Sequence, residues 1–203
     1  MSGTETADSF SAQPLPSKII AKISGKSFVP NDVIGLEDLS YLKVLHYGFD
    51  DETHEGELIV NKAIAEEVLD IFRELYEKRF PIEKIILIDE FDADDDKSMA
   101  ANNSSAFCFR RLTGETGLSE HAYGFAVDIN PLYNPYVRRW EDESLLILPP
   151  SGAIYIERNP NIKGTICKGN DCYNAFVSRG WEWGGEWSDI DDNHHFQKYP
   201  RKK

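Results

Sequence analysis

The stretch that decides the fold is Ser119-Glu-His121-Ala-Tyr-Gly124-Phe-Ala-Val-Asp128-Ile-Asn-Pro131. After Gly124, apolar residues alternate with small or polar ones as far as Asn130, a pattern that predicts a half-buried β-strand. Asp128 should project from the polar face of this strand, and His121 should lie in the loop that precedes it. Small residues on the polar face leave room for a metal ion or a substrate to approach the backbone. The stretch therefore predicts a carboxylate and an imidazole that converge on one ion.

A second cluster of possible metal ligands, Asp191-Asp192-Asn-His194-His195-Phe196, occurs near the C-terminus. Together the two stretches supply two imidazoles and a carboxylate as ligands, with a further carboxylate to spare. Catalytic zinc is held by three such protein ligands and keeps a fourth position open for water. The spacing of His121 and Asp128 alone is weak evidence, because isolated pairs of this kind arise by chance.

The longer motifs around these residues are more specific. Residues 119–128 match the pattern Ser-x-His-x-x-Gly-x-Ala-x-Asp at every specified position. Asp192, His195 and Phe196 match an acidic residue three positions before a histidine that is followed by an aromatic residue. Both patterns resemble the motifs of the VanY-type D-alanyl-D-alanine carboxypeptidases and the related peptidoglycan L,D-endopeptidases, a family of zinc metallopeptidases.

The resemblance extends over most of the chain, from about Leu42 to Phe196, in the order that the family shows. Ser105-Ala-Phe-Cys-Phe-Arg110 is similar to a family segment that ends in a substrate-binding arginine. Gly180-Trp-Glu-Trp-Gly-Gly-Glu-Trp187 is similar to the tryptophan-rich run before the second motif. The fold implied is the hedgehog/DD-peptidase-like α+β fold, with a small antiparallel sheet that carries the zinc site and helices that flank it.

The resemblance also implies a role for each matching residue. The zinc ligands would be His121, Asp128 and His195. Asp192 would act as the general base, and Arg110 would bind a substrate carboxylate or carbonyl. Ser119 would support the substrate site through hydrogen bonds. The chain departs from the family in three places. His194 stands beside His195 and leaves the choice of ligand open by spacing, the base is aspartate where some relatives have glutamate, and Cys108 replaces a frequent asparagine.

Reaction chemistry supports the same assignment. Zinc lowers the pKa of bound water to about 7, and a nearby carboxylate can take the proton and pass it to a leaving amine. Asp192 is suited to this task because it is close to a ligand without being needed as one. Arg110 could stabilise an oxyanion or clamp a terminal carboxylate, so the sequence leaves carboxypeptidase and endopeptidase, including a phage-type lysin, both open. A non-catalytic domain stabilised by zinc is the alternative of another class, but it would need neither Asp192 nor Arg110.

Composition sets further limits. The chain has 203 residues and a formal net charge of −13, which argues against a nucleic-acid partner. We expect a flexible leader over residues 1–30 and a single peptidase domain over residues 31–203, functioning as a monomer on peptidoglycan peptides. No apolar run approaches the roughly 20 residues that span a bilayer. No export signal is visible, although the substrate implies the cell envelope or the extracellular space.

Periodicity predicts the remaining elements. Apolar residues at helical spacing predict a helix over residues 61–80, and a short buried strand should follow at residues 85–88. The acidic segment 89–96 is interpreted as a solvated turn, and a polar loop over residues 92–105 should lead to a strand that ends at Arg110. A short helix is expected to begin at Asp171 and to end at Gly180. Cys167 and Cys172 could pair in an oxidising compartment.

Overall fold

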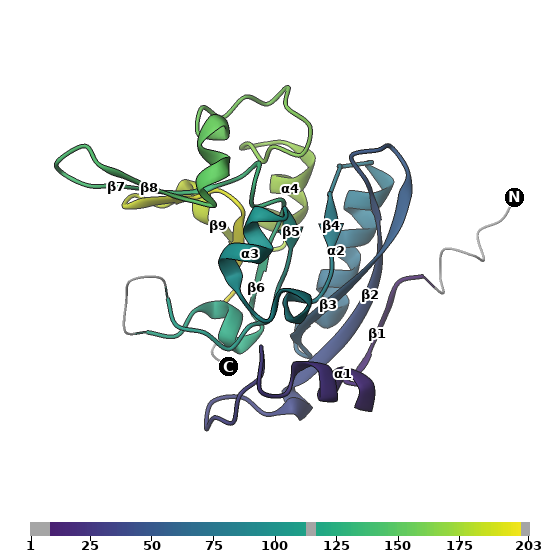
Figure 1. Cartoon of the computed structure of the whole chain (residues 1–203). Helices are drawn as coiled ribbons and strands as arrows, with labels where there is room; N and C mark the ends of the chain where they lie inside the picture. Colours follow the sequence, from purple (N-terminus) through teal and green to yellow (C-terminus); the bar gives the residue numbers. More distant parts are fainter. Residues whose placement is uncertain (1–8, 113–116, 200–203) are drawn as a thin grey trace, which may run out of the picture.

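The computed structural model of the chain describes residues 9–112 and 117–199. Its fold is of the mixed α+β class, with small antiparallel sheets and short helices, as predicted (Figure 1). The strands are β1 (Ser11–Pro14), β2 (Leu39–Tyr47), β3 (Thr53–Asn61), β4 (Lys84–Ile85), β5 (Asn103–Ser104), β6 (Ala126–Asp128), β7 (Tyr136–Arg139), β8 (Leu145–Leu148), β9 (Glu182–Trp183), β10 (Ile190–Asp192) and β11 (His195–Gln197). The helices are α1 (Ser17–Ile23), α2 (Ala65–Glu77), α3 (Asp95–Ala100) and α4 (Asp171–Val177), with short 3₁₀ turns η1 (Leu36–Asp38), η2 (Ile88–Phe91), η3 (Glu120–Tyr123), η4 (Pro150–Tyr155) and η5 (Gly184–Glu186).

The N-terminal half is built on the antiparallel sheet β1-β2-β3. Successive side chains of a strand point to opposite faces, so each face of this sheet can be buried separately. Leu42 and Val44 of β2 pack in the larger core, to which α2 also contributes, whereas Leu39 and Tyr41 pack in a second cluster with α1. The sheet is therefore buried on both sides.

Residues 11–14 and 17–23 differ from the flexible leader expected over residues 1–30. The first segment is β1, which pairs with β2, and the second is α1. Ile19 and Ile23 are buried in the second cluster. Their spacing of four residues places both side chains on one face of the helix, where burial of apolar surface stabilises it.

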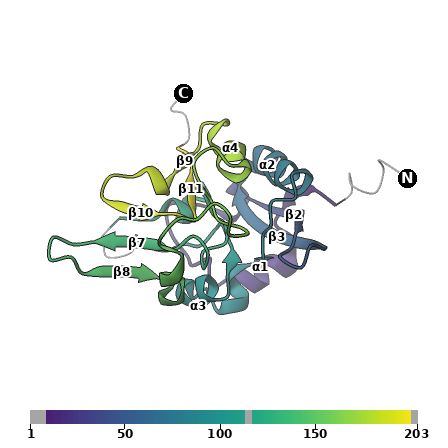
Figure 2. The same cartoon turned by 90° about the horizontal axis from the view of Figure 1, so that it is seen from above.

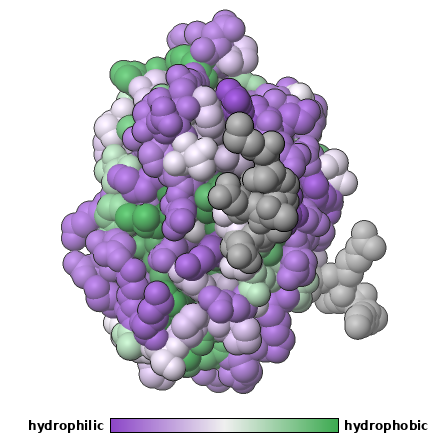
Figure 3. All heavy atoms as spheres, turned by 90° about the vertical axis from the view of Figure 1, so that its right-hand side faces the viewer, coloured by the Kyte–Doolittle hydropathy of each residue, from purple (hydrophilic) through white to green (hydrophobic). Residues whose placement is uncertain are grey.

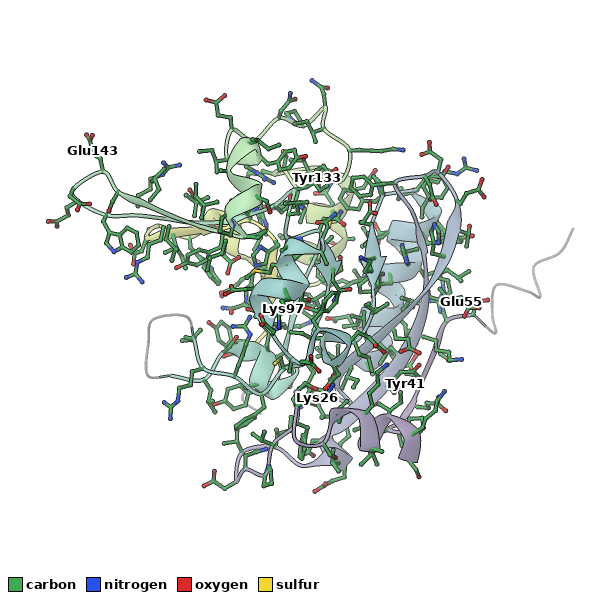
Figure 4. The ribbon with its side chains drawn as sticks, viewed as in Figure 1. Lys26, Tyr41, Glu55, Lys97, Tyr133 and Glu143 are labelled. Atoms are coloured by element: carbon green, nitrogen blue, oxygen red, sulfur yellow. The ribbon has the colours of Figure 1, made fainter. Side chains whose placement is uncertain are left out.

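The C-terminal half holds two small antiparallel sheets, in the orders β6-β11-β9 and β10-β7-β8. The hairpin of β7 and β8 extends away from the body of the protein (Figure 2), and Glu143 lies near its outer end (Figure 4). The stacked rings of Phe176 in α4 and Phe196 in β11, with centroids 4.1 Å apart, join this half to the larger core. The sheet that contains β11 is thereby fixed against the helices.

Several element boundaries differ from the sequence-based expectations. The helix expected from residue 61 begins four residues later, because Asn61 accepts a bond from the Ala63 amide in a turn before it. The expected strand at 85–88 is only the two-residue β4, and the loop over 92–105 contains α3 and β5. The helix after Cys167 takes its N-cap from Asn170, whose side chain accepts from the Tyr173 amide at 3.0 Å.

The acidic segment 89–96 is not a solvated turn throughout. Asp89 is buried and accepts hydrogen bonds from the backbone amide and the hydroxyl of Ser27 at 3.1 and 2.8 Å. The surface seen in Figure 3 is mostly hydrophilic, in keeping with the high content of charged residues. Among the described residues, no helix combines the length and the apolar character needed to cross a bilayer.

Candidate metal centre

Three short elements bring His121, Asp128 and His195 together. His121 lies in η3, where the Ser119 hydroxyl caps the first turn by accepting from the His121 amide at 3.3 Å. Asp128 ends β6 and faces His195, the first residue of β11, in the antiparallel register. Gly124 links η3 to β6 in the left-handed region, with φ +73°. A residue with a Cβ is strained in that region, so glycine suits the tight connection between the two ligand-bearing elements.

The side-chain atoms of the three residues lie within hydrogen-bond distance of one another. His121 Nε2 is 3.0 Å from Asp128 Oδ2, and His195 Nδ1 is 2.9 Å from Asp128 Oδ1. The two ring nitrogens, His121 Nε2 and His195 Nδ1, are 3.2 Å apart. Tetrahedral zinc with bonds of about 2.0–2.2 Å places its ligand atoms roughly 3.3 Å apart. The cluster is therefore close to the size that a zinc ion requires.

The hydrogen bonds on the outer side of each ring leave lone pairs directed into the cluster. His121 Nδ1 donates to the Ala106 carbonyl, which can only accept, so the facing Nε2 carries the lone pair. His195 Nε2 lies 3.0 Å from Gln197 Oε1 and donates to it, which leaves Nδ1 as the inward atom. Metal-binding histidines characteristically make such outer bonds to oxygen acceptors. With both rings neutral, two lone pairs and a carboxylate face one another, a set that suits a bound cation.

The charges of the cluster also favour a bound cation. Asp128 is 2 % exposed, and although burial works against its charged form, the neighbouring imidazoles hold the pKa of this carboxyl well below its usual range. Burial also opposes protonation of His195, but the hydrogen bond and charge of Asp128 outweigh it and raise the pKa of His195 to about 9. A metal cation would have to displace that proton, which makes metal affinity dependent on pH.

His194 lies beside the cluster but is not part of it, although spacing left it as an alternative to His195. Its Nδ1 donates to the Asn134 carbonyl at 2.8 Å. Its Nε2 lies 3.1 Å from Asp192 Oδ1 and 4.0 Å from Asp128 Oδ2. Of the two adjacent histidines, His195 is thus the one that joins His121 and Asp128.

Asp192, the expected general base, ends β10 beside the cluster. Its side chain is 15 % exposed. Its buried Oδ1 lies 3.1 Å from His194 Nε2, but that nitrogen carries no proton when His194 Nδ1 donates to the Asn134 carbonyl, so within the described part of the chain Oδ1 accepts no hydrogen bond. A buried carboxylate oxygen without a partner is costly, and such atoms in native proteins often serve a bound ion, a water or a catalytic step. Gly184 allows the close approach of β10, because a Cβ there would lie 2.6 Å from the Asp192 carbonyl oxygen.

Arg110 reaches the same cavity, but not from the end of a strand. The segment 106–110 has no regular secondary structure and is held by separate bonds, such as that from the Phe107 amide to the Ile59 carbonyl at 3.0 Å. Arg110 Nη2 pairs with Asp95 Oδ2 at 3.1 Å. Asp95 was missed because only the fold shows that the acidic segment turns into α3 next to the site.

A solvent-open cavity with about 650 Å³ of empty space contains the cluster. Trp187 forms part of its wall and packs against His195, with ring centroids 5.5 Å apart. Trp181 and Trp183 are buried in the larger core instead. The tryptophan-rich run thus supplies both core packing and one wall of the cavity.

Comparison with known proteins agrees with the motifs. A family model described as D-alanyl-D-alanine carboxypeptidase matches residues 113–198. The predicted family resemblance is confirmed over that segment. It contains the three clustered residues and Asp192, whereas Arg110 and Asp95 precede it. No curated protein and no solved structure matches the chain.

Proposed function

We propose that the protein is a zinc-dependent peptidase that hydrolyses peptidoglycan stem peptides, of the D-alanyl-D-alanine carboxypeptidase type. The observation that carries the proposal is the convergence of His121 Nε2, Asp128 and His195 Nδ1 within a segment that matches a peptidase family. The outer hydrogen bonds of both imidazoles support a cation at this point. His121, Asp128 and His195 would hold the zinc, which when bound lowers the pKa of water and polarises a carbonyl.

The other side chains of the cavity have separate tasks in this proposal. Asp192 takes a proton from the attacking water and returns it to the amine that leaves when the C–N bond breaks. Arg110 binds the substrate, either at a terminal carboxylate or at a carbonyl oxygen. Ser119 lines the cavity and holds the turn that carries His121, so its role combines support of the site with contact to the substrate.

Endopeptidase action on the same stem peptides is the second candidate. A carboxypeptidase needs a cation that is free to take the terminal carboxylate of the substrate. Arg110 is instead already paired with Asp95. This ion pair favours an internal carbonyl as the group that Arg110 binds.

The substrate also implies a place of action. Because peptidoglycan lies outside the cytoplasm, we propose the cell envelope or the extracellular space as the location. We further propose that the protein acts as a monomer, since one chain supplies the three zinc ligands and the candidate base.

Replacement of the base tests the proposal. Asp192→Asn should keep the fold and the zinc content but should lose about 10²–10⁴-fold in turnover of stem peptides, because an amide cannot accept the proton. Asp191→Asn is the matched control, since this neighbouring carboxylate is 45 % exposed and lies near Arg139 rather than in the cluster. Equal turnover of the Asp192→Asn variant and the native protein would contradict the assignment of the base.

A further inference from the structure

Asp95 is a carboxylate that the zinc chemistry does not require, yet it lines the same cavity as the cluster. It is the first residue of α3, and its Oδ2 lies 3.1 Å from Arg110 Nη2. The two side chains are 25 % and 24 % exposed. An ion pair with this degree of burial is screened less by solvent than a surface pair, so Asp95 offsets part of the positive charge of Arg110.

Capping of α3 does not explain this carboxylate. The N-cap of the helix is Asp94, whose side chain accepts from the Lys97 amide at 3.1 Å. Asp96, the next residue, is exposed and equally able to favour the helix N-terminus by its charge. Helix formation therefore does not explain why the Asp95 side chain lies against Arg110.

The guanidinium retains N–H donors besides the Nη2 that faces Asp95. Arg110 Nε is buried and has no hydrogen-bond partner among the described residues. Burial works against the charge of Arg110, but Asp95, Asp128 and Asp192 raise its pKa, so it stays protonated. A carbonyl oxygen needs one donor and adds no charge. A free carboxylate would bring another negative charge close to Asp95 and Asp192, whereas the charge of Asp128 would be offset by the zinc ion that it is proposed to hold.

We propose that Asp95 sets the specificity of the site: by pairing with Arg110 it makes the guanidinium bind a neutral peptide carbonyl in preference to a free C-terminal carboxylate. The inference rests on the proposed peptidase function and favours its endopeptidase form. Asp95 is thus a specificity residue that acts through Arg110.

The test compares Asp95→Asn with Asp96→Asn. Both variants remove one carboxylate from the first turn of α3, but only Asp95 contacts Arg110. The probes are an acetylated tripeptide that ends in D-alanyl-D-alanine and the same peptide with an amidated C-terminus. Calorimetry measures their affinities in the Asp192→Asn background, in which turnover is expected to be slow, and kcat/KM is measured with Asp192 intact.

The native site should bind the amidated peptide at least as tightly as the free acid. Asp95→Asn should raise the affinity for the free acid relative to the amide by about tenfold, through loss of like-charge repulsion. Asp96→Asn should leave the ratio unchanged. KM should carry the change more than kcat, because the effect is on binding.

An unchanged ratio in Asp95→Asn, or an equal change in Asp96→Asn, would overturn the inference. Failure of either peptide to bind any variant would also overturn it, since the inference places a peptide group at Arg110. If the peptides bind with the expected ratios but the native protein hydrolyses no stem peptide, the inference stands and the proposed function fails.

Discussion

His46 in β2 is a buried histidine whose proton equilibrium should affect stability. It is 3 % exposed, its Nδ1 donates to the Ile82 carbonyl at 2.8 Å, and its ring stacks on that of His54, with centroids 5.4 Å apart. Burial, only partly offset by the bond to Ile82 and the charge of Asp50, lowers the pKa of His46 to about 4. The folded protein therefore holds this imidazole neutral.

The sign of the pH effect follows from this pKa. An unfolded chain protonates the histidine at a pKa of about 6.5, so the unfolded state binds more protons between pH 6.5 and pH 4. The contribution of neutral His46 to the free energy of unfolding is fully present above pH 6.5 and is lost as the pH falls toward 4. At pH 5 the loss should be about 2 kcal/mol, from 1.36 kcal/mol per pKa unit.

Urea unfolding of the native protein and of His46→Asn at pH 7.5 and pH 5.0 measures this contribution. Asparagine keeps an N–H donor for the Ile82 carbonyl but does not titrate. Between pH 7.5 and pH 5.0 the free energy of unfolding should fall by about 2 kcal/mol less in His46→Asn than in the native protein. The other titrating groups contribute equally to both proteins and cancel in this comparison. The same pH dependence in His46→Asn and the native protein would refute the reasoning.

Two further substitutions test the surroundings of the cluster. Gln197→Leu removes the acceptor of His195 Nε2 and should weaken zinc affinity about 10–100-fold in competition with a chelator. Tyr199→Phe, which removes a different partner of Gln197, should leave that affinity nearly unaltered, and equal affinities in all three proteins would exclude the role of Gln197. Gly184→Ala places a Cβ 2.8 Å from that of Asp192 and should cost about 1–3 kcal/mol of stability in thermal unfolding while lowering hydrolysis; full stability would show that β10 adapts without strain.

The residues of the cluster could be predicted from the sequence because both motifs are local. The spacing around His121 and Asp128 and the acidic-to-histidine spacing before Phe196 identified the residues that the fold brings together. His195 begins β11 and faces Asp128 in the antiparallel register, whereas His194 lies in the turn before that strand. The position of Gln197 near the cluster could also be predicted from the sequence, since it lies two residues after His195 and shares its face of the strand.

Other parts of the site depend on contacts between distant segments. Asp95 approaches Arg110 only because α3 packs beside the irregular segment 106–110, and no local pattern encodes that packing. Asp89 appeared solvated in a run of acidic residues, yet its burial depends on Ser27, 62 residues earlier. By contrast, Ile19 and Ile23 have a helical spacing that the polar composition of the N-terminal segment concealed.

The central claim is that a metal held by His121, Asp128 and His195 enables the protein to cut peptidoglycan stem peptides. Mass spectrometry of purified muropeptides, after incubation with the protein as isolated, after chelation and after return of Zn²⁺, tests it most directly. The claim predicts products shortened at one peptide bond, their loss on chelation, their recovery with zinc, and no products from His121→Ala under any condition. Unchanged muropeptide masses with zinc-loaded protein, or undiminished cleavage by His121→Ala, would contradict it.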